Sequence, residues 1–174
     1  MTSKLKTDVL ETVSGSGTIA LTNQLSGMTS ASMPSGSVIQ VVSSQFTLGV
    51  ISTSSTSYVS TGVGLSITPT SSTSKILVRV TGGRAQNPYV SQRMTNTIYR
   101  NGTVDLANDS TGLENIGGGL NTLVVVPHSM EAEDSPATTS SVNYTCYFKS
   151  GTGQPNLYFS QPSNITITLM EIKG

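Results

Sequence analysis

The chain has 174 residues, of which 10% are charged, with nine Lys and Arg balancing nine Asp and Glu. An average soluble domain has about 25% charged residues. The lack of a basic excess argues against electrostatic nucleic-acid binding, and the single Cys and single His exclude a disulfide framework and a His/Cys zinc site. Ser and Thr supply 28 and 25 residues. The class that remains is an all-β protein with polar, uncharged strands and no cofactor.

Residues 1–37 predict an extended arm that serves attachment or oligomerisation. Only two weak alternating patches occur there, at 9–13 and 18–21, and residues 27–36 are rich in Ser and Gly. So few apolar residues cannot build a core of their own. The start also lacks the apolar core of a signal peptide, and no window approaches the ~20 apolar residues of a spanning helix. We therefore expect a protein made in a cytoplasm that does not insert into a membrane by itself.

A long uncharged stretch suggests that the chain functions in an assembly. The 63 residues from Thr12 to Ser74 contain no Asp, Glu, Lys, Arg or His. The surface of a soluble monomer normally carries charges on roughly a quarter or more of its positions. Two explanations remain open: burial of this stretch against other subunits, or a surface made of Ser and Thr. Both suit a fibrous or multimeric structural protein.

The first half of residues 38–174 breaks into short apolar runs at the spacing of β-hairpins. In the most regular of them, Ile76, Val78 and Val80 alternate with Leu77 and Arg79, which places Arg79 on the face opposite the core. Gly82 and Gly83 are predicted to end this strand. The predicted strands of this half are 38–50, 57–60, 63–68 and 75–80.

The second half continues the pattern. Asn101-Gly102 lies between extended runs and predicts a hairpin with a type I′ turn, because both residues tolerate the positive φ that this turn requires. Residues 120–126 are the most apolar strand, and 131–136 are predicted to be an acidic loop. No stretch has a 3.6-residue apolar period over three turns. The remaining predicted strands are 90–99, 104–107, 141–149, 156–160 and 165–172.

Eight to ten strands in residues 38–174 predict a two-sheet antiparallel jelly-roll sandwich. In the strand 141–149, Val142, Tyr144, Cys146 and Phe148 share one face, so Cys146 is expected to be a buried, inert thiol. His128, at the end of the apolar run 120–126, is expected to cap a strand or lie at the surface. We predict no catalytic site, since the acidic residues fall in expected loops and not in a cleft with paired carboxylates.

The charges separate by sign along the chain, and two interpretations remain open. They either lie on solvated loops and faces, or the two sets meet across a subunit boundary and fix the register between copies. The positive set is Lys75, Arg79, Arg84, Arg93 and Arg100, and the negative set is Asp105, Asp109, Glu114, Glu131, Glu133 and Asp134. Tyr89, in the predicted loop Asn87-Pro-Tyr-Val, either packs within that loop or is a candidate contact to a partner.

Several motifs resemble a pattern of tail-fibre and appendage proteins of marine and cyanobacterial bacteriophages. The run Tyr58-Val-Ser-Thr-Gly-Val-Gly-Leu-Ser-Ile-Thr-Pro is similar to their strand pattern Tyr-x-x-Thr-Gly-Leu-x-x-x-Ile-Thr-Pro, which precedes a Ser-rich turn and a strand like Lys75-Ile-Leu-Val. The hairpin Ile98-Tyr-Arg-Asn-Gly-Thr, the last run Ile165-Thr-Ile-Thr-Leu-Met-Glu-Ile, and the opening Leu5-Lys-Thr-Asp also resemble that family.

The resemblance implies a jelly-roll head similar to those of complement C1q and tumour necrosis factor, assembled as a homotrimer. It implies a virion surface protein that serves as a tail-fibre-like appendage and contacts the host, with the arm bound to other tail or capsid proteins and a host surface glycan as a possible ligand. The short arm before the head leaves a second hypothesis, a capsid decoration or cement protein that stabilises the shell.

Overall fold

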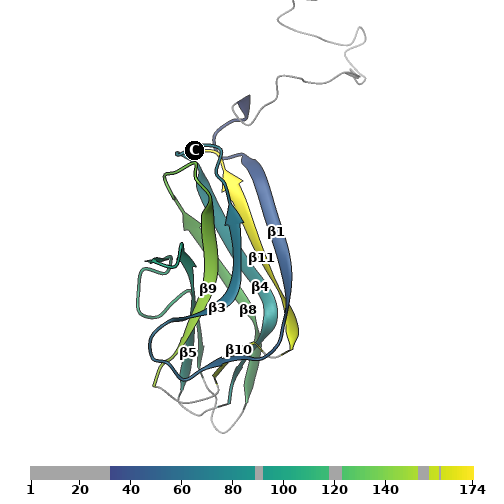
Figure 1. The fold of residues 1–174 in the computed structure, drawn as a ribbon, viewed down its shortest axis with the longest axis vertical. Coiled ribbons are helices and arrows are strands. Elements are labelled where there is room, and N and C mark those ends of the chain that lie inside the picture. Colours follow the sequence, from purple (N-terminus) through teal and green to yellow (C-terminus); the bar gives the residue numbers. More distant parts are fainter. Residues whose placement is uncertain (1–31, 89–91, 118–122, 153–156, 161) are drawn as a thin grey trace, which may run out of the picture. The chain divides into compact units, whose positions relative to one another are not determined.

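The computed structural model describes residues 32–88, 92–117, 123–152, 157–160 and 162–174. These residues form strands, turns and loops without an α-helix, and Met33–Gly174 make one compact unit. The strands are β1 (Val38–Leu48), β2 (Ile51–Thr53), β3 (Val59–Ile67), β4 (Lys75–Asn87), β5 (Arg93–Arg100), β6 (Val104–Asp105), β7 (Glu114–Gly117), β8 (Val124–Asp134), β9 (Val142–Ser150), β10 (Leu157–Ser160) and β11 (Ser163–Ile172) (Figure 1).

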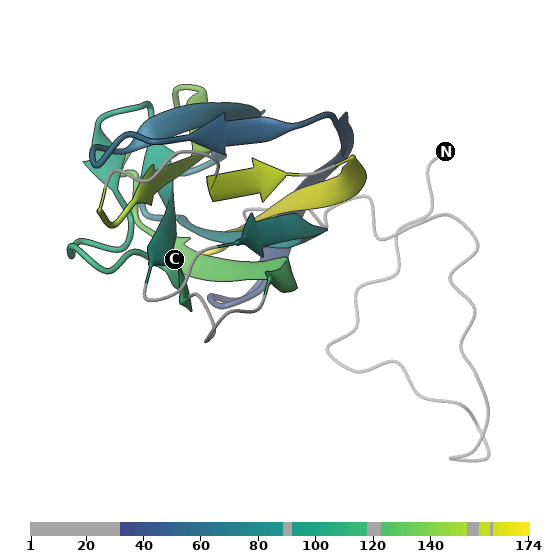
Figure 2. The same cartoon turned by 90° about the horizontal axis from the view of Figure 1, so that it is seen from below.

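The strands form two antiparallel sheets that pack against each other (Figure 2). In the six-stranded sheet β1 pairs with β11, β11 with β4, and β4 with β8, while β10 pairs with both β4 and β2. In the five-stranded sheet β3 pairs with β9 and β9 with β5, and β6 and β7 pair with separate parts of β5. This order confirms the predicted all-β jelly-roll sandwich, in which Greek-key connections carry the chain between sheets.

The core lies between the sheets and follows the predicted alternation. Ile76, Val78 and Val80 of β4 are fully buried, whereas the Arg79 side chain is 57% exposed. Successive residues of a strand point to opposite faces, so one face of each strand supplies the core. The same alternation buries Val142, Tyr144, Cys146 and Phe148 of β9, and Ile165, Ile167 and Leu169 of β11.

Gly82 and Gly83 do not end a strand, in contrast to the sequence-based expectation. They form an irregularity within β4, which continues to Asn87 and shifts its register to β8 between Gly82 and Ala85. Both glycines have positive φ, 92° and 73°. A Cβ on Gly82 would lie 2.9 Å from the Asn164 carbonyl oxygen of β11. A β-bulge with left-handed backbone therefore bends β4 where a turn was expected.

The two runs 57–60 and 63–68 are also joined, because β3 passes through both with a register shift between Ser60 and Gly64. The Asn101-Gly102 prediction is confirmed. Both residues have positive φ, 50° and 69°, and the Thr103 amide donates to the Arg100 carbonyl at 3.1 Å. These are the features of a type I′ hairpin turn.

The predicted acidic loop 131–136 is largely strand. β8 extends to Asp134 and pairs with β4 along this length, with Glu131 opposite Arg79. The strand is alternating rather than uniformly apolar: His128 and Met130 face the core, and Glu131 and Glu133 face solvent. Glu131 and Glu133 lie in a strand and not in a loop, and each pairs with a cation of the neighbouring strand β4, Arg79 or Lys75.

Of the predicted arm 1–37, residues 1–31 lie outside the described part of the chain. Next to the sandwich, the Gly36 amide donates to the Lys173 carbonyl at 2.8 Å, and the Lys173 amide donates to the Ser37 carbonyl at 2.9 Å. Residues 36–37 are thus held against the end of β11.

Candidate functional site

The outer surface of the six-stranded sheet carries an uncharged region over β1 and β11, which we call the hydroxyl face. The register places Ser43 beside Thr168, Gln45 beside Thr166, and Thr47 beside Asn164. The Ser43 and Thr168 hydroxyls are 2.9 Å apart and share a hydrogen bond. The six residues of the hydroxyl face are Ser43, Gln45, Thr47, Asn164, Thr166 and Thr168.

Apolar side chains adjoin the hydroxyl face at the start of β1. Val41 is 58% exposed and Val38 is 49% exposed. Val41 lies beside Met170, which lies beside Leu77, so a short apolar row crosses three strands on the outer surface. Scattered exposed apolar residues are common, but a row that borders an uncharged surface is a feature of surfaces that bind other proteins.

Two ion pairs flank this region on β4 and β8. Arg79 Nε lies 3.8 Å from Glu131 Oε2, and Lys75 Nζ lies 2.7 Å from Glu133 Oε1. All four side chains are about half exposed, between 49% and 57%. Exposed pairs add little to stability. Between β4 and β8, residues of the positive and negative sets thus pair within one chain. A further role for Arg79, Glu131 and Glu133 at a subunit boundary stays a prediction.

The other predicted interface charges differ in their surroundings. Arg84 and Arg93 are exposed, and no ion pair to either is found within the described residues. Tyr89, the predicted host contact, lies outside the described residues. These three positions therefore stay predictions, and Arg84 and Arg93 remain accessible to a partner.

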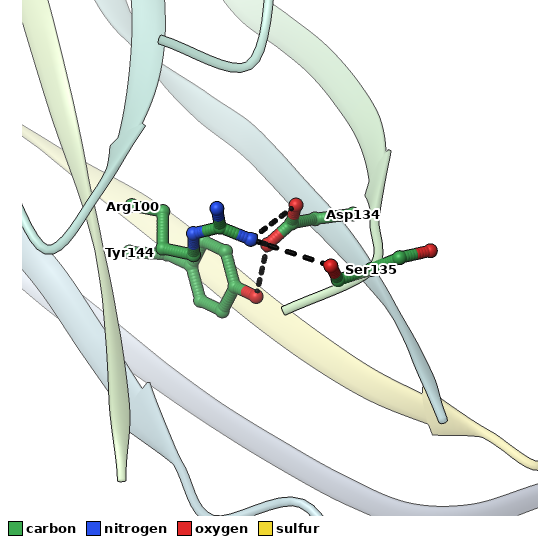
Figure 3. Close-up of polar contacts among 4 residues, drawn as sticks. All are labelled: Arg100, Asp134, Ser135 and Tyr144. Atoms are coloured by element: carbon green, nitrogen blue, oxygen red, sulfur yellow. Dashed lines mark hydrogen bonds and ion pairs between the residues drawn. The ribbon is translucent and has the colours of Figure 1, made fainter. Parts of the chain in front are cut away.

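Arg100 and Asp134 form an ion pair that joins the two sheets (Figure 3). Arg100 Nη1 donates to both oxygens of Asp134, at 2.9 and 3.0 Å, and the Tyr144 hydroxyl donates to Oδ2 at 2.7 Å. Arg100 and Tyr144 come from β5 and β9, and Asp134 comes from β8 of the other sheet. Burial, then the hydrogen bond to Asp134, raises the pKa of Tyr144, so its hydroxyl remains a donor.

A second polar link between the sheets surrounds His128, which is only 2% exposed. Its Nδ1 lies 2.6 Å from Glu114 Oε2 of β7, and its Nε2 lies 2.8 Å from the Phe159 carbonyl oxygen of β10. Its ring also stacks on Phe159. The expectation of a capping or surface imidazole is therefore wrong. His128 shares strand parity with Val124, Val126 and Met130, and this parity was the sequence signal for an inward side chain.

Glu114 is satisfied by several donors. It accepts hydrogen bonds from Asn96 Nδ2 at 2.6 Å and from the Ser129 amide at 3.0 Å. Burial raises the pKa of the Glu114 carboxyl, but the hydrogen bond and charge of His128, with the Ser129 and Asn96 donors, outweigh burial and lower the pKa overall. Glu114 and His128 are the residue types of a catalytic acid–base pair. All their hydrogen bonds described here go to other protein groups, however, so the pair is a structural link between the sheets.

The surroundings of Cys146 confirm the expectation of a buried thiol. The thiol is fully buried in β9, and burial, then the charge of Glu114, raises its pKa to about 12. The thiolate is the reactive form of cysteine, so this thiol is inert at neutral pH. Within the described ranges, no group of three or more His, Cys, Asp or Glu residues could hold a metal ion.

No helix in the described part of the chain is long and apolar enough to cross a membrane. No protein-family model and no curated protein matches the chain. The hydroxyl face, with its apolar border and flanking ion pairs, is the candidate functional site: a surface suited to burial against another protein.

Proposed function

We propose that this chain is a structural protein of a bacteriophage virion surface, a homotrimeric fibre-like appendage that contacts the host. It carries no enzymatic activity and binds no nucleic acid. The motifs around Tyr58, Asn101 and Ile165 support the assignment to phage appendages, because they resemble that family along most of the chain. The arm links the head to other virion proteins, and a host surface glycan is the partner at the distal side.

The observation that carries the proposal is the hydroxyl face. An 11-residue strand, β1, lies at the edge of its sheet and has no charged residue. Long uncharged edges are normally avoided in monomers because they associate with other chains. In a trimer this surface would be covered, and burial of Val38 and Val41 would contribute at about 25 cal/mol per Å².

Sedimentation of the purified full chain tests the oligomeric state. We expect a species of about three times the 18.1 kDa mass of one chain. Ser43→Lys places a charge on the hydroxyl face and should dissociate the trimer, because an ammonium would be buried without a partner. Ser60→Lys is the matched control, since Ser60 is also an exposed serine of an edge strand but lies on the other sheet. Equal effects of both variants would contradict the role of this face.

The alternative function is a capsid decoration protein, whose trimer would stabilise the head shell through the same face. Labelled antibody against the chain, viewed by electron microscopy on intact virions, separates the two. Signal on the tail supports the appendage, signal over the head supports decoration, and no signal on the particle overturns both.

A further inference from the structure

Three tyrosines gather on the outer surface of the five-stranded sheet, and with Lys149 they form what we call the tyrosine cluster. The ring centroids of Tyr99 and Tyr147 are 4.4 Å apart, and those of Tyr58 and Tyr99 are 5.8 Å apart in an edge-on arrangement. Lys149 Nζ lies 4.2 Å from the centroid of the Tyr58 ring. The rings are half-buried, so each keeps part of its surface in solvent.

The cluster faces away from the core. Tyr147 of β9 lies between the buried residues Cys146 and Phe148, which point into the sandwich. Its neighbours across the strands are Ser60 of β3 and Thr97 of β5. Because the cluster is on the five-stranded sheet and the hydroxyl face is on the six-stranded sheet, it stays accessible when the hydroxyl face is covered.

The strand beside the tyrosines presents only small side chains on this surface. The register places Ser60, Gly64 and Ser66 of β3 on the same side as Tyr147. Apart from its two chain neighbours, no described residue has an atom within 4 Å of the Cβ position of Gly62, which lies at the bulge between Ser60 and Gly64. The Thr145 side chain of β9 covers Gly64, since its Oγ1 lies 2.5 Å from the Cβ position of that glycine. The part of β3 beside the rings that carries only small side chains is therefore at Ser60 and Gly62.

The polar groups around the rings carry both signs of charge. Lys149 supplies an ammonium, while Asp105 accepts a hydrogen bond from Thr97 and Asp109 accepts hydrogen bonds from Thr111 and Gly112. Burial, then the charges of Asp105 and other neighbours, raises the pKa of Tyr58 to about 12, and burial also raises that of Tyr99. The Tyr58 and Tyr99 phenols therefore stay neutral at physiological pH, and the Tyr58 hydroxyl is itself buried with no hydrogen-bond partner among the described residues.

We propose that the tyrosine cluster is a saccharide-binding site that takes a neutral sugar unit of a host surface glycan. Aromatic rings offer apolar faces to the C–H surface of a sugar ring, and their hydroxyls bond its polar edge. Ser60 lies beside Tyr147, and Ser66, Asn143 and Thr145 continue this face as a hydrogen-bonded polar row, which suits a polyhydroxyl ligand better than a lipid chain. Neighbouring charges of both signs favour a neutral ligand over an anionic one. The host origin of the glycan rests on the proposed function, whereas the site itself does not.

The test is binding of the purified full chain to an array of bacterial surface polysaccharides and their neutral oligosaccharides, with calorimetry on those that bind. We expect at least one neutral saccharide to bind. Tyr99→Ala and Tyr147→Ala should each weaken it about tenfold, the loss expected for one aromatic contact. Tyr147→Phe keeps the ring and should retain most of the affinity. Tyr158→Ala is the matched control, because Tyr158 is a half-buried tyrosine of the other sheet, and it should leave binding unchanged.

Nuclear magnetic resonance of the unmodified chain provides a readout that does not depend on the folding of variants. The saccharide should shift the ring signals of Tyr99 and Tyr147 and leave those of Tyr158 in place. The proposal is overturned if no neutral saccharide binds more tightly than about 1 mM, or if Tyr158→Ala weakens binding as much as Tyr147→Ala. A trimer found on the virion that binds no saccharide would contradict this inference alone, and a monomer that binds saccharide would contradict the proposed function alone.

Discussion

Glu114 and His128 meet at 2.6 Å between the two sheets, one from β7 and the other from β8. Both nitrogens of the His128 ring face acceptors, since Nε2 approaches the Phe159 carbonyl. The Phe159 carbonyl oxygen can only accept, so Nε2 donates to it, while Nδ1 and the Glu114 carboxylate share the second hydrogen bond. The Glu114–His128 contact and the Arg100–Asp134 ion pair have the same structural role, because each connects β8 to the five-stranded sheet.

Glu114→Gln should destabilise the fold by about 3 kcal/mol, because it removes a buried carboxylate that accepts hydrogen bonds from Asn96 and the Ser129 amide and contacts the His128 ring. Chemical denaturation measures this loss. Glu131→Gln is the control, since Glu131 belongs to a half-exposed pair and should leave the midpoint unchanged. A loss at Glu131 equal to that at Glu114 would contradict the structural role of the buried pair.

Stability should fall in acid because of Glu114. The pKa of its carboxyl in the folded protein lies below the ordinary value of 4.5. The folded state thus favours the ionised form, and its contribution is present above pH 4.5 and lost as the pH falls through the folded pKa. Melting temperatures from pH 7 down to about pH 3 should decline more steeply in the unmodified protein than in Glu114→Gln. Parallel curves would exclude Glu114 as the source.

Tyr144→Phe should cost about 1.5 kcal/mol, as expected for a hydrogen bond to a charged acceptor. The substitution removes the hydroxyl that donates to Asp134 at 2.7 Å and keeps the buried ring. Tyr147→Phe is the control, because no hydrogen bond of the Tyr147 hydroxyl is found within the described part of the chain. A free energy of unfolding that is the same for both variants would argue against the Asp134 bond.

Gly82→Ala should destabilise by about 2 kcal/mol, since φ is 92° and the added Cβ would meet the Asn164 carbonyl oxygen at 2.9 Å. Gly49→Ala is the control, because no atom lies within 4 Å of its Cβ position and its φ is not in the left-handed region. Thermal melting of both variants tests the bulge in β4. A Gly82→Ala protein as stable as Gly49→Ala would contradict it.

Alternation made the core predictable, as the buried faces of β4, β9 and β11 illustrate. The Asn101-Gly102 turn was predictable because two adjacent residues that tolerate positive φ have one common use between strands. The prediction that Gly82 and Gly83 end a strand was wrong, because a pair of glycines suits a β-bulge as well as a turn. Only the pairing of β4 with β8 and β11 distinguishes the two.

The candidate site was predictable in part. The uncharged stretch indicated an association surface, but its composition alone could not select β1 and β11, because sheet partners such as Ser43 and Thr168, 125 residues apart in the chain, are set by the fold. The charge sets were visible, yet their pairing within one chain depends on the register of β4 against β8. The contact of His128 with Glu114 likewise depends on how β7 and β8 approach between the sheets.

Equilibrium sedimentation of the purified full chain tests the central proposal most directly. The account predicts a trimer at micromolar concentration that Ser43→Lys dissociates and Ser60→Lys leaves intact. A stable monomer of 18.1 kDa with the hydroxyl face in solvent would contradict it.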